Sequence, residues 1–208
     1  TLSELNIKIK SGKLYAIVGP VASGKSSIFF FFFRELPIYS GDVLINGDSS
    51  YASQDPWLFS STVRNNILFG LPFDKLRYKE TVKHCALDTD FQQLSHGDKT
   101  FVGERGSALS GGQRARVSLA RAVYRNASIY LLDDPLSAVD AHVGKFLFDE
   151  CLGPQGYLAR QKATRILITH QVHFLKEADW IIVMDKGSVV RQGTWKDVMD
   201  IDLTQYVS

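Results

Sequence analysis

Residues 19–26 read Gly-Pro-Val-Ala-Ser-Gly-Lys-Ser and match the phosphate-binding pattern G-x-x-x-x-G-K-[ST]. In such a loop the backbone N–H groups of residues 22–26 wrap around phosphate oxygens, assisted by the positive end of the following helix. The Lys25 ammonium group reaches the β- and γ-phosphates, and the Ser26 hydroxyl group is a ligand for Mg²⁺. A chance match to this pattern is expected in roughly one chain in a hundred of this size. We therefore predict a nucleotide-binding loop made by Gly19, Pro20, Val21, Ala22, Ser23, Gly24, Lys25, Ser26 and Ser27.

A second glycine-rich turn, Leu109-Ser110-Gly111-Gly112-Gln113, precedes a helical pattern. Ser110 and Gln113 have the spacing of a capping box, which is sufficient to explain a turn that only begins a helix. Glycine at two positions of a first helical turn has poor helix propensity, however, and bare backbone there suits the close approach of a phosphate. Both interpretations can hold together. Because the turn lies too far along the chain to belong to the first loop, the pair indicates a nucleotide held between two copies of a domain.

Two adjacent carboxylates follow an apolar run, Ile129-Tyr130-Leu131-Leu132. A buried strand of this kind delivers Asp133 to the edge of the sheet beside the Mg²⁺ site, as in the Walker B motif. An aspartate after a strand is otherwise often a turn or cap residue. Asp134 comes next, at a position where a general base for an attacking water would lie.

These groups meet only if strands and helices alternate so that the loops gather at one edge of a sheet. Apolar runs and breaker residues predict strands at 14–18, 42–45, 49–53, 128–132 and 165–169, and a β-hairpin with strands at 180–184 and 188–191. Helices are predicted at 24–35, 62–69, 75–86, 111–124, 141–152 and 173–177. The expected fold is α/β with a mainly parallel core sheet, antiparallel β elements and a helical subdomain of about residues 55–125 inserted into one domain of residues 1–208.

Composition narrows the class of protein. The net charge is +2, from 24 basic and 22 acidic residues. The sequence contains no stripe of basic residues, so we do not expect nucleic acid as a partner. Cys85 and Cys151 lack metal-binding spacing, and we expect free thiols although one disulfide is formally possible. The longest wholly apolar run, residues 28–33, is far shorter than the about 20 residues of a bilayer span, and no secretory signal is present. The chain does not begin with Met, so we expect it to be a piece of a longer protein.

Residues 29–33 are five consecutive phenylalanines. A helix that is apolar on every side has to be buried, so the run is expected to form a core helix behind the phosphate-binding loop. The alternative is a stretch altered from its original sequence. Neither interpretation gives the run a function.

Together these motifs resemble the nucleotide-binding domains of ATP-binding cassette (ABC) transporters, and the resemblance covers essentially the whole chain. Leu109–Gln113 resembles the family's signature motif, and Gln54 in Ser53-Gln54-Asp55-Pro56-Trp57 resembles its Q-loop. Ser137–Asp140 is similar to the D-loop, His170 to the switch histidine, and Thr100–Gly106 to the segment before the signature in exporters. Finer similarity to the first such domain of multidrug-resistance-associated (C-subfamily) exporters comes from Gly19–Val21, Pro56–Phe59, Asn66–Gly70 and Asp133–Gly144.

The resemblance implies an ATPase module on the cytosolic face of a membrane, expected to be the plasma membrane, with ATP and Mg²⁺ as its ligands. The implied partners are a second nucleotide-binding domain, joined head-to-tail across two ATPs, and the transmembrane domains of the same transporter. Gln54 would contact Mg²⁺ or the attacking water and link the site to the membrane helices. His170 would bind the γ-phosphate, Asp140 would connect the paired sites, and Ser110, Gly111, Gly112 and Gln113 would contact the ATP on the partner's loop.

Two departures from the family pattern are informative. Most strongly hydrolytic members have Glu where this chain has Asp134, which predicts a site that binds ATP and hydrolyses it slowly. The aromatic residue that stacks on adenine in the family would fall before Thr1, and Tyr15 is a poor substitute, so nucleotide binding by this chain is expected to be weak.

A regulatory domain of an ABC-type channel or channel regulator remains an alternative, and Asp134 is compatible with it. His170 favours the exporter, because the chloride-channel relative lacks this histidine in its first domain. A soluble ABC ATPase that acts on DNA or ribosomes is opposed by the near-neutral charge and by the exporter-like segment at residues 100–106.

Overall fold

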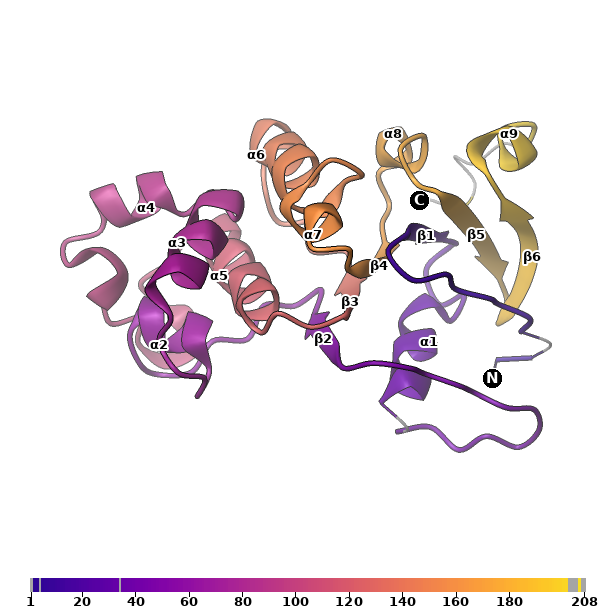
Figure 1. Cartoon of the computed structure of the whole chain (residues 1–208), viewed down its shortest axis with the longest axis horizontal. Helices are drawn as coiled ribbons and strands as arrows, with labels where there is room; N and C mark the ends of the chain where they lie inside the picture. The colour runs from indigo at the N-terminus through magenta and orange to yellow at the C-terminus, as the bar shows by residue number, and fades with distance from the viewer. Residues whose placement is uncertain (1, 4, 34, 202–205, 207–208) are drawn as a thin grey trace.

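The computed structural model describes residues 2–3, 5–33, 35–201 and 206. Six strands form one sheet in the order β2-β3-β4-β1-β5-β6, in which β1 to β5 are parallel and β6 is antiparallel to β5. The predicted α/β fold with a mainly parallel sheet is confirmed (Figure 1). The strands are β1 (Leu14–Val18), β2 (Ser49–Ala52), β3 (Ile129–Asp133), β4 (Thr164–Ile168), β5 (Trp180–Asp185) and β6 (Ser188–Gly193).

The central strands β1 and β3 are almost wholly apolar because both of their faces are covered, and β4 also buries Arg165. Every residue of β1, β3 and β4 is buried. Alternate side chains point to opposite faces of the sheet. In β1, Leu14, Ala16 and Val18 belong to one hydrophobic cluster, whereas Tyr15 and Ile17 belong to the other. Helix α1 (Lys25–Phe32) contributes to the second cluster through Phe29, so it covers the face to which Tyr15 points.

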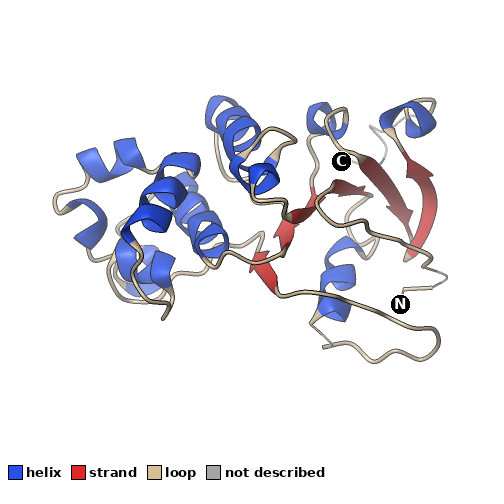
Figure 2. Cartoon of the chain, viewed as in Figure 1, coloured by secondary structure: helices blue, strands red, loops and turns tan. Residues whose placement is uncertain are grey.

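Helices occupy most of the chain between β2 and β3 and form the helical part on the left of Figure 2. Here α2 (Val63–Leu68) and α3 (Lys75–His84) both pack against α5 (Gly111–Tyr124). Polar side chains begin each helix, because Thr62, Asp74 and Ser110 accept hydrogen bonds from the free backbone N–H groups of the first turn. The remaining helices are α4 (Asp88–Gln93), α6 (Ala141–Leu147), α7 (Tyr157–Arg160), α8 (Val172–Leu175) and α9 (Trp195–Val198).

The strand predicted at residues 42–45 is wrong. This segment has no regular secondary structure, and Leu44 is 86% exposed. The apolar residues there have strand-like composition, but a strand is stable only beside a partner, and none of the strands in the described ranges runs next to this segment.

The phenylalanine run is helical as predicted, but α1 ends at Phe32, before the expected end at Glu35. Its complete burial was a wrong prediction. Phe29 is 1% exposed, whereas Phe30 is 39% exposed. One helix on one face of a sheet can bury only one of its sides, so a helix that is apolar all round exposes the rest.

The helix predicted at residues 141–152 is interrupted. Helix α6 ends at Leu147 and continues as a π-helix (Phe148–Leu152). The short helices α4, α7 and α9 were not predicted. Cys85 and Cys151 are both buried and both free, as expected. None of the helices in the described part of the chain has the length and apolar character needed to cross a membrane.

Candidate nucleotide-binding site

The phosphate-binding loop joins the end of β1 at Val18 to the start of α1 at Lys25. It therefore lies outside the carboxyl end of a strand with parallel neighbours on both sides, β4 and β5. Ligands of open α/β sheets bind at this edge. The N–H groups at the start of α1 point out of the same end of the helix.

The backbone of the loop has the conformation that its sequence requires. Gly24 precedes α1 with a φ of 98°, and Ala22 also has a positive φ, of 65°. A Cβ atom at Gly19 would lie 2.5 Å from the Met184 carbonyl oxygen, so only glycine fits this close approach to β5. The loop is tied to the β5–β6 turn, because the Gly187 N–H group donates to the Ser23 carbonyl oxygen at 2.9 Å.

Lys25 lies inside the loop with 7% of its surface exposed. Its Nζ atom donates to the carbonyl oxygens of Gly19 and Pro20, at 2.8 Å to Pro20. Burial lowers the pKa of Lys25, and the charges of Asp133 and Asp134 act in the opposite direction. The buried Ser23 hydroxyl group has no hydrogen-bond partner among the residues that the structure describes. A buried ammonium group held only by carbonyl oxygens, beside an unpartnered hydroxyl group, fits a loop built to receive phosphate oxygens.

Asp133 ends β3 and is 4% exposed. Burial raises its pKa, whereas hydrogen bonds from the hydroxyl groups of Ser26 and Tyr51 and the charge of Lys25 lower it. The Tyr51 hydroxyl group lies 3.3 Å from Asp133 Oδ2. The structure thus brings together Ser26 and Asp133, two of the three predicted Mg²⁺ ligands, and leaves the third, Gln54, exposed after β2.

These donors fit Mg²⁺, which is usually held by one or two carboxylates together with phosphates and water. Among the described residues there is no group of three or more His, Cys, Asp or Glu side chains that could hold a metal ion by itself. A site with one carboxylate and one hydroxyl group would take its other ligands from the nucleotide and from water.

Asp134 is held in a strained backbone conformation, with a φ of 44°. Its N–H group donates to the Ile168 carbonyl oxygen at 3.0 Å, which ties it to the end of β4. The side chain is 4% exposed, and its Oδ1 atom has no hydrogen-bond partner within the described part of the chain. Burial raises the pKa of Asp134, and His170 is the largest opposing influence. His170 lies just after β4, so the predicted base and switch histidine are neighbours.

Gln54 is the predicted catalytic residue that the structure does not join to this group. It lies two residues after β2 and is exposed. No side-chain hydrogen bond of Gln54 occurs within the described residues. Because β2 lies beside β3, Gln54 is nevertheless on the same carboxyl edge as Asp133.

The second glycine-rich turn is well ordered and separate from the loop. Ser110 and Gln113 form both hydrogen bonds of a capping box, at 2.9 and 3.2 Å. The Gln113 amide also donates to Asp90 of α4 at 3.0 Å. A Cβ atom at Gly111 would meet open space. Within the described residues no hydrogen bond connects this turn to residues 19–27, so its exposed backbone is free for another ligand.

One residue of the site was missed. Tyr51 bonds to Asp133, and burial raises its pKa to about 12, with the nearby Asp133 charge as the next cause. Tyr51 therefore stays a neutral hydrogen-bond donor at ordinary pH. Its polar hydroxyl group on an otherwise half-buried strand was the available signal, but the sequence does not show which strand lies beside it.

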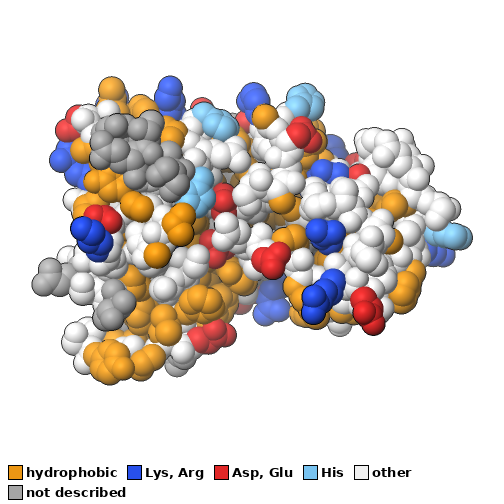
Figure 3. Space-filling model, turned by 180° about the vertical axis from the view of Figure 1, so that it is seen from behind, with side chains coloured by type: hydrophobic (Ala, Val, Ile, Leu, Met, Phe, Trp, Pro, Cys, Tyr) orange, Lys and Arg blue, Asp and Glu red, His pale blue; other side chains and the backbone are white. Residues whose placement is uncertain are grey.

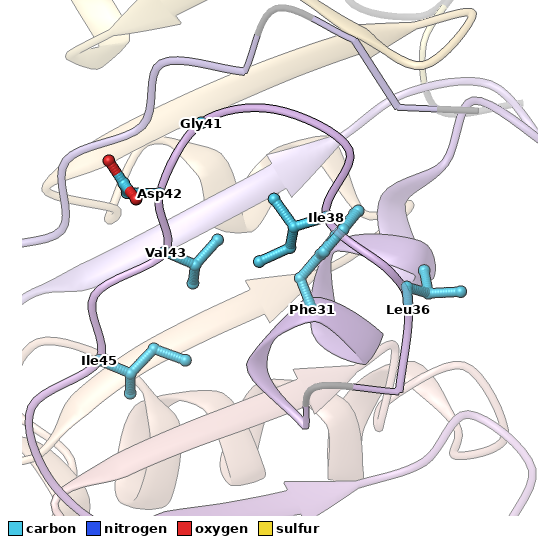
Figure 4. Close-up of a pocket in the computed structure, with 7 residues that line it drawn as sticks. All are labelled: Phe31, Leu36, Ile38, Gly41, Asp42, Val43 and Ile45. Atoms are coloured by element: carbon cyan, nitrogen blue, oxygen red, sulfur yellow. The ribbon is translucent and has the colours of Figure 1, made fainter.

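A hollow elsewhere on the surface is unrelated to this site. Its lining comes from α1 and the loop that follows, and is mainly apolar (Figure 4). Figure 3 shows hydrophobic side chains gathered over this same region, at the lower left. The lining residues are Phe31, Leu36, Ile38, Gly41, Asp42, Val43 and Ile45, and none belongs to the phosphate-binding loop.

Comparison with known proteins supplies the family. Residues 2–137 match the family described as "ABC transporter". The chain is 51% identical over 203 residues to "Probable multidrug resistance-associated protein lethal(2)03659" of Drosophila melanogaster, covering 98% of this chain and 14% of that protein. It is 50% identical over 199 residues to "ATP-binding cassette sub-family C member 4" of Mus musculus, covering 96% and 15%. It is 47% identical over 199 residues to "ABC transporter C family member 9" of Arabidopsis thaliana, covering 96% and 13%. The chain thus spans 13–15% of the length of these relatives.

Proposed function

The chain belongs to the ABC transporter family, and from this membership we propose that residues 1–208 form the first nucleotide-binding domain of a multidrug-resistance-associated, C-subfamily exporter. In this proposal the domain binds and hydrolyses ATP with Mg²⁺ and so powers export by the whole transporter. Residues 55–125 form its inserted helical subdomain. The cargo is selected by transmembrane domains that lie outside this chain.

One observation carries the proposal. Groups that could bind phosphate, hold a cation and activate water come together at the carboxyl ends of three neighbouring parallel strands, β1, β3 and β4. These groups are Lys25, Ser26, Asp133, Asp134 and His170, whose mutual proximity is evident in the electrostatic influence that they exert on one another.

Each side chain then has a task. Lys25 exchanges its bonds to the Gly19 and Pro20 carbonyl oxygens for bonds to phosphate oxygens. Ser26 and Asp133 would hold Mg²⁺, with Gln54 as the third predicted ligand, and the ion would neutralise charge on the transferred phosphoryl group. Asp134 orients the attacking water and accepts its proton, and His170 donates a hydrogen bond to the γ-phosphate.

Asp134 is a weak base for this task. Its backbone is tied to Ile168, so the side chain cannot move forward to compensate for its length. The carboxylate is about 1 Å or more further from the water than a glutamate would place it, and such a displacement costs on the order of 10²-fold in rate. We therefore propose that this site retains ATP and turns it over slowly.

The partners follow from the second turn and from Gln54. A second nucleotide-binding domain presents its own phosphate-binding loop to Ser110, Gly111, Gly112 and Gln113, and Asp140 lies near this contact. Gln54 leads into an exposed aromatic surface that contains Trp57 and Phe69, which pack at 6.3 Å. Exposed aromatic surfaces of this kind commonly mark interfaces. We propose that the transmembrane domains of the transporter contact it, at the cytosolic face of the plasma membrane.

The second candidate function is a regulatory nucleotide-binding domain of an ABC-type channel or channel regulator. The short Asp134 side chain is compatible with it as well as with the exporter, because slow hydrolysis suits a domain in which bound ATP acts as a signal. Electrical recording from the full-length protein in a planar bilayer distinguishes the two. Nucleotide-gated ion conductance would support the channel, whereas ATP-dependent substrate accumulation in vesicles without conductance would support the exporter.

Binding of ATP by this chain tests the proposal directly. Calorimetric titration with ATP and Mg²⁺ should show one site, and Lys25→Ala should weaken binding by about 10- to 100-fold, since it removes charge-assisted hydrogen bonds. Lys176→Ala, at the end of α8, is the control and should leave affinity unchanged. Absence of binding by the wild-type chain at millimolar ATP would refute the proposal.

A further inference from the structure

Tyr51 lies on the strand next to Asp133, and the register of the two strands explains their contact. Strands β2 and β3 are parallel neighbours in which Tyr51 pairs with Leu131. Because side chains alternate along a strand, Asp133 lies on the same face of the sheet as Leu131, one diagonal step from Tyr51. The long phenol side chain spans this step, so that its hydroxyl group lies 3.3 Å from Asp133 Oδ2.

The Tyr51 ring is held from the side opposite the sheet. Its centroid lies 6.1 Å from that of Phe29 and 5.4 Å from that of Phe33, with interplanar angles of 80° and 69°. Both are edge-to-face arrangements, which aromatic pairs prefer. Phe29 is part of the core and Phe33 follows the end of α1. Two of the five consecutive phenylalanines therefore restrict the position of the Tyr51 hydroxyl group.

Asp133 has few other anchors. Among the described residues, its one side-chain hydrogen bond comes from the hydroxyl group of Tyr51, and the nearby hydroxyl group of Ser26 also lowers its pKa. Ser26 would share the cation with Asp133, so it is itself part of the metal site. Tyr51 approaches Asp133 from the adjacent strand β2, and it is not one of the predicted Mg²⁺ ligands. It is thus the contact that can orient the carboxylate from outside the metal site, as supporting residues of metal centres do.

We propose that Tyr51 is a positioning residue for Mg²⁺ binding. Its hydroxyl group holds Oδ2 of Asp133 so that the carboxylate is presented to the cation, and Phe29 and Phe33 hold the ring that carries the hydroxyl group. The inference rests on the proposed function, because it assigns a support to the cation site of the ATP complex.

The test separates metal binding from nucleotide binding. Mn²⁺, a paramagnetic substitute for Mg²⁺, is titrated into the 208-residue chain saturated with the non-hydrolysable analogue adenylyl imidodiphosphate, and free Mn²⁺ is measured by electron paramagnetic resonance. Tyr51→Phe removes only the hydroxyl group. It should weaken Mn²⁺ binding by about 3- to 10-fold. This is at or below the smallest effects of residues that support metal ligands, because the hydrogen bond from Tyr51 to Asp133 is long, at 3.3 Å. Affinity for the analogue without metal should stay within about twofold of wild type, since Tyr51 touches no predicted phosphate ligand.

Tyr130→Phe is the matched control. Tyr130 lies on β3 but belongs to the other hydrophobic cluster, and its hydroxyl group bonds to the backbone of Ala127 and Val123. This variant also loses a buried phenol hydroxyl group, and its Mn²⁺ affinity should equal that of wild type.

Unchanged Mn²⁺ affinity in Tyr51→Phe would overturn the inference. So would an equal loss of analogue affinity without metal, because Tyr51 would then act on the loop as a whole. If Tyr51→Phe does not fold, as judged by circular dichroism, Phe33→Leu is the variant to measure. It leaves the Tyr51 hydroxyl group in place but removes the aromatic contact that holds the Tyr51 ring. Unchanged Mn²⁺ affinity in Phe33→Leu would then overturn the inference. A wild-type chain that binds no analogue would refute the proposed function and this inference together, whereas normal wild-type binding with an unaffected variant would refute the inference alone.

Discussion

Replacing Asp134 by glutamate should accelerate ATP hydrolysis at the site built on Lys25. The backbone at residue 134 cannot shift, since its N–H group bonds to Ile168 and its carbonyl oxygen accepts bonds from the N–H and hydroxyl groups of Ser137, at 3.2 and 2.8 Å. The added methylene group therefore moves the carboxylate forward by about 1 Å or more. Within the described ranges, Oδ1 of Asp134 has no hydrogen bond that the substitution would break.

The expected gain follows from that distance. A misplacement near 1 Å costs on the order of 10²-fold in rate, which corresponds to about 2.7 kcal/mol of transition-state stabilisation. Part of this gain will be offset where the larger side chain has to fit a site that is almost fully buried. We therefore expect Asp134→Glu to increase turnover at this site by about 10- to 100-fold, with ATP affinity within about threefold of wild type.

Phosphate release from the full-length protein is the assay, with the catalytic carboxylate of the second nucleotide-binding domain removed so that only this site contributes. Asp88→Glu makes the same change at an exposed position in the first turn of α4 and should not alter turnover. Asp134→Asn should abolish hydrolysis. Turnover of Asp134→Glu no faster than wild type, in a protein that folds and binds ATP normally, would refute the reasoning about side-chain length.

Three further predictions concern stability and the second turn. Phe29→Ala should lower the free energy of unfolding, measured in urea, by about 3–5 kcal/mol. Phe30→Ala should lower it by less than about 1 kcal/mol, because Phe30 is 39% exposed whereas Phe29 is 1% exposed. Equal losses would contradict the packing of α1. Hydrogen bonds from Ser128 lower the pKa of Asp48, so its contribution to stability is present above pH 3.8 and is lost as pH falls through the lowered pKa. Asp48→Asn should therefore be less stable than wild type in urea at pH 7 and indistinguishable from it near pH 2, and a pH-independent difference would count against the charge. Ser110→Asp keeps a hydrogen-bond acceptor for the first turn of α5, so its stability in urea should equal that of wild type. Its negative charge should repel the phosphate that is proposed to approach this turn, and so should slow phosphate release at the partner's site. An unchanged rate of phosphate release would exclude this approach.

Local pattern was enough to predict the central sheet and the phosphate-binding loop. Strands β1, β3 and β4 are buried on both faces. Strands β1 and β3 therefore read as nearly unbroken apolar runs, and β4 reads as the apolar run Ile166–Ile168 preceded by the buried Thr164 and Arg165. Lys25 and Ser26 lie at the start of α1, just beyond the loop that follows β1, and Asp133 and Asp134 lie at the end of β3. Their proximity could be predicted because carboxyl ends of parallel strands share one edge of the sheet.

Features that depend on a partner segment were beyond local pattern. Residues 42–45 have the composition of a strand but no strand beside them, and Tyr51 reaches Asp133 only through the register of β2 against β3. The change from α6 to a π-helix after Leu147 could not be predicted, because π-helical turns are rare and the sequence gives no separate signal for them. Helix α9 did carry a signal, since Thr194 and Asp197 form a capping box.

The two phosphate-binding elements differ in how completely they are prepared. The second glycine-rich turn is held by two sets of contacts. One is its capping box, and the other is Asp90, which accepts a hydrogen bond from Gln113 and forms an ion pair with Arg116 at 2.6 Å. Gly111 is exposed and Gly112 is half-buried, and the turn that carries them is held by these hydrogen bonds, so we expect little ordering on binding of a phosphate. At the proposed site on Lys25, the proposed base Asp134 has a short side chain on a backbone that is tied to Ile168. If the domain pairs head-to-tail as we propose, this chain would support hydrolysis on its partner's loop better than on its own, and the two bound ATP molecules would have unequal lifetimes.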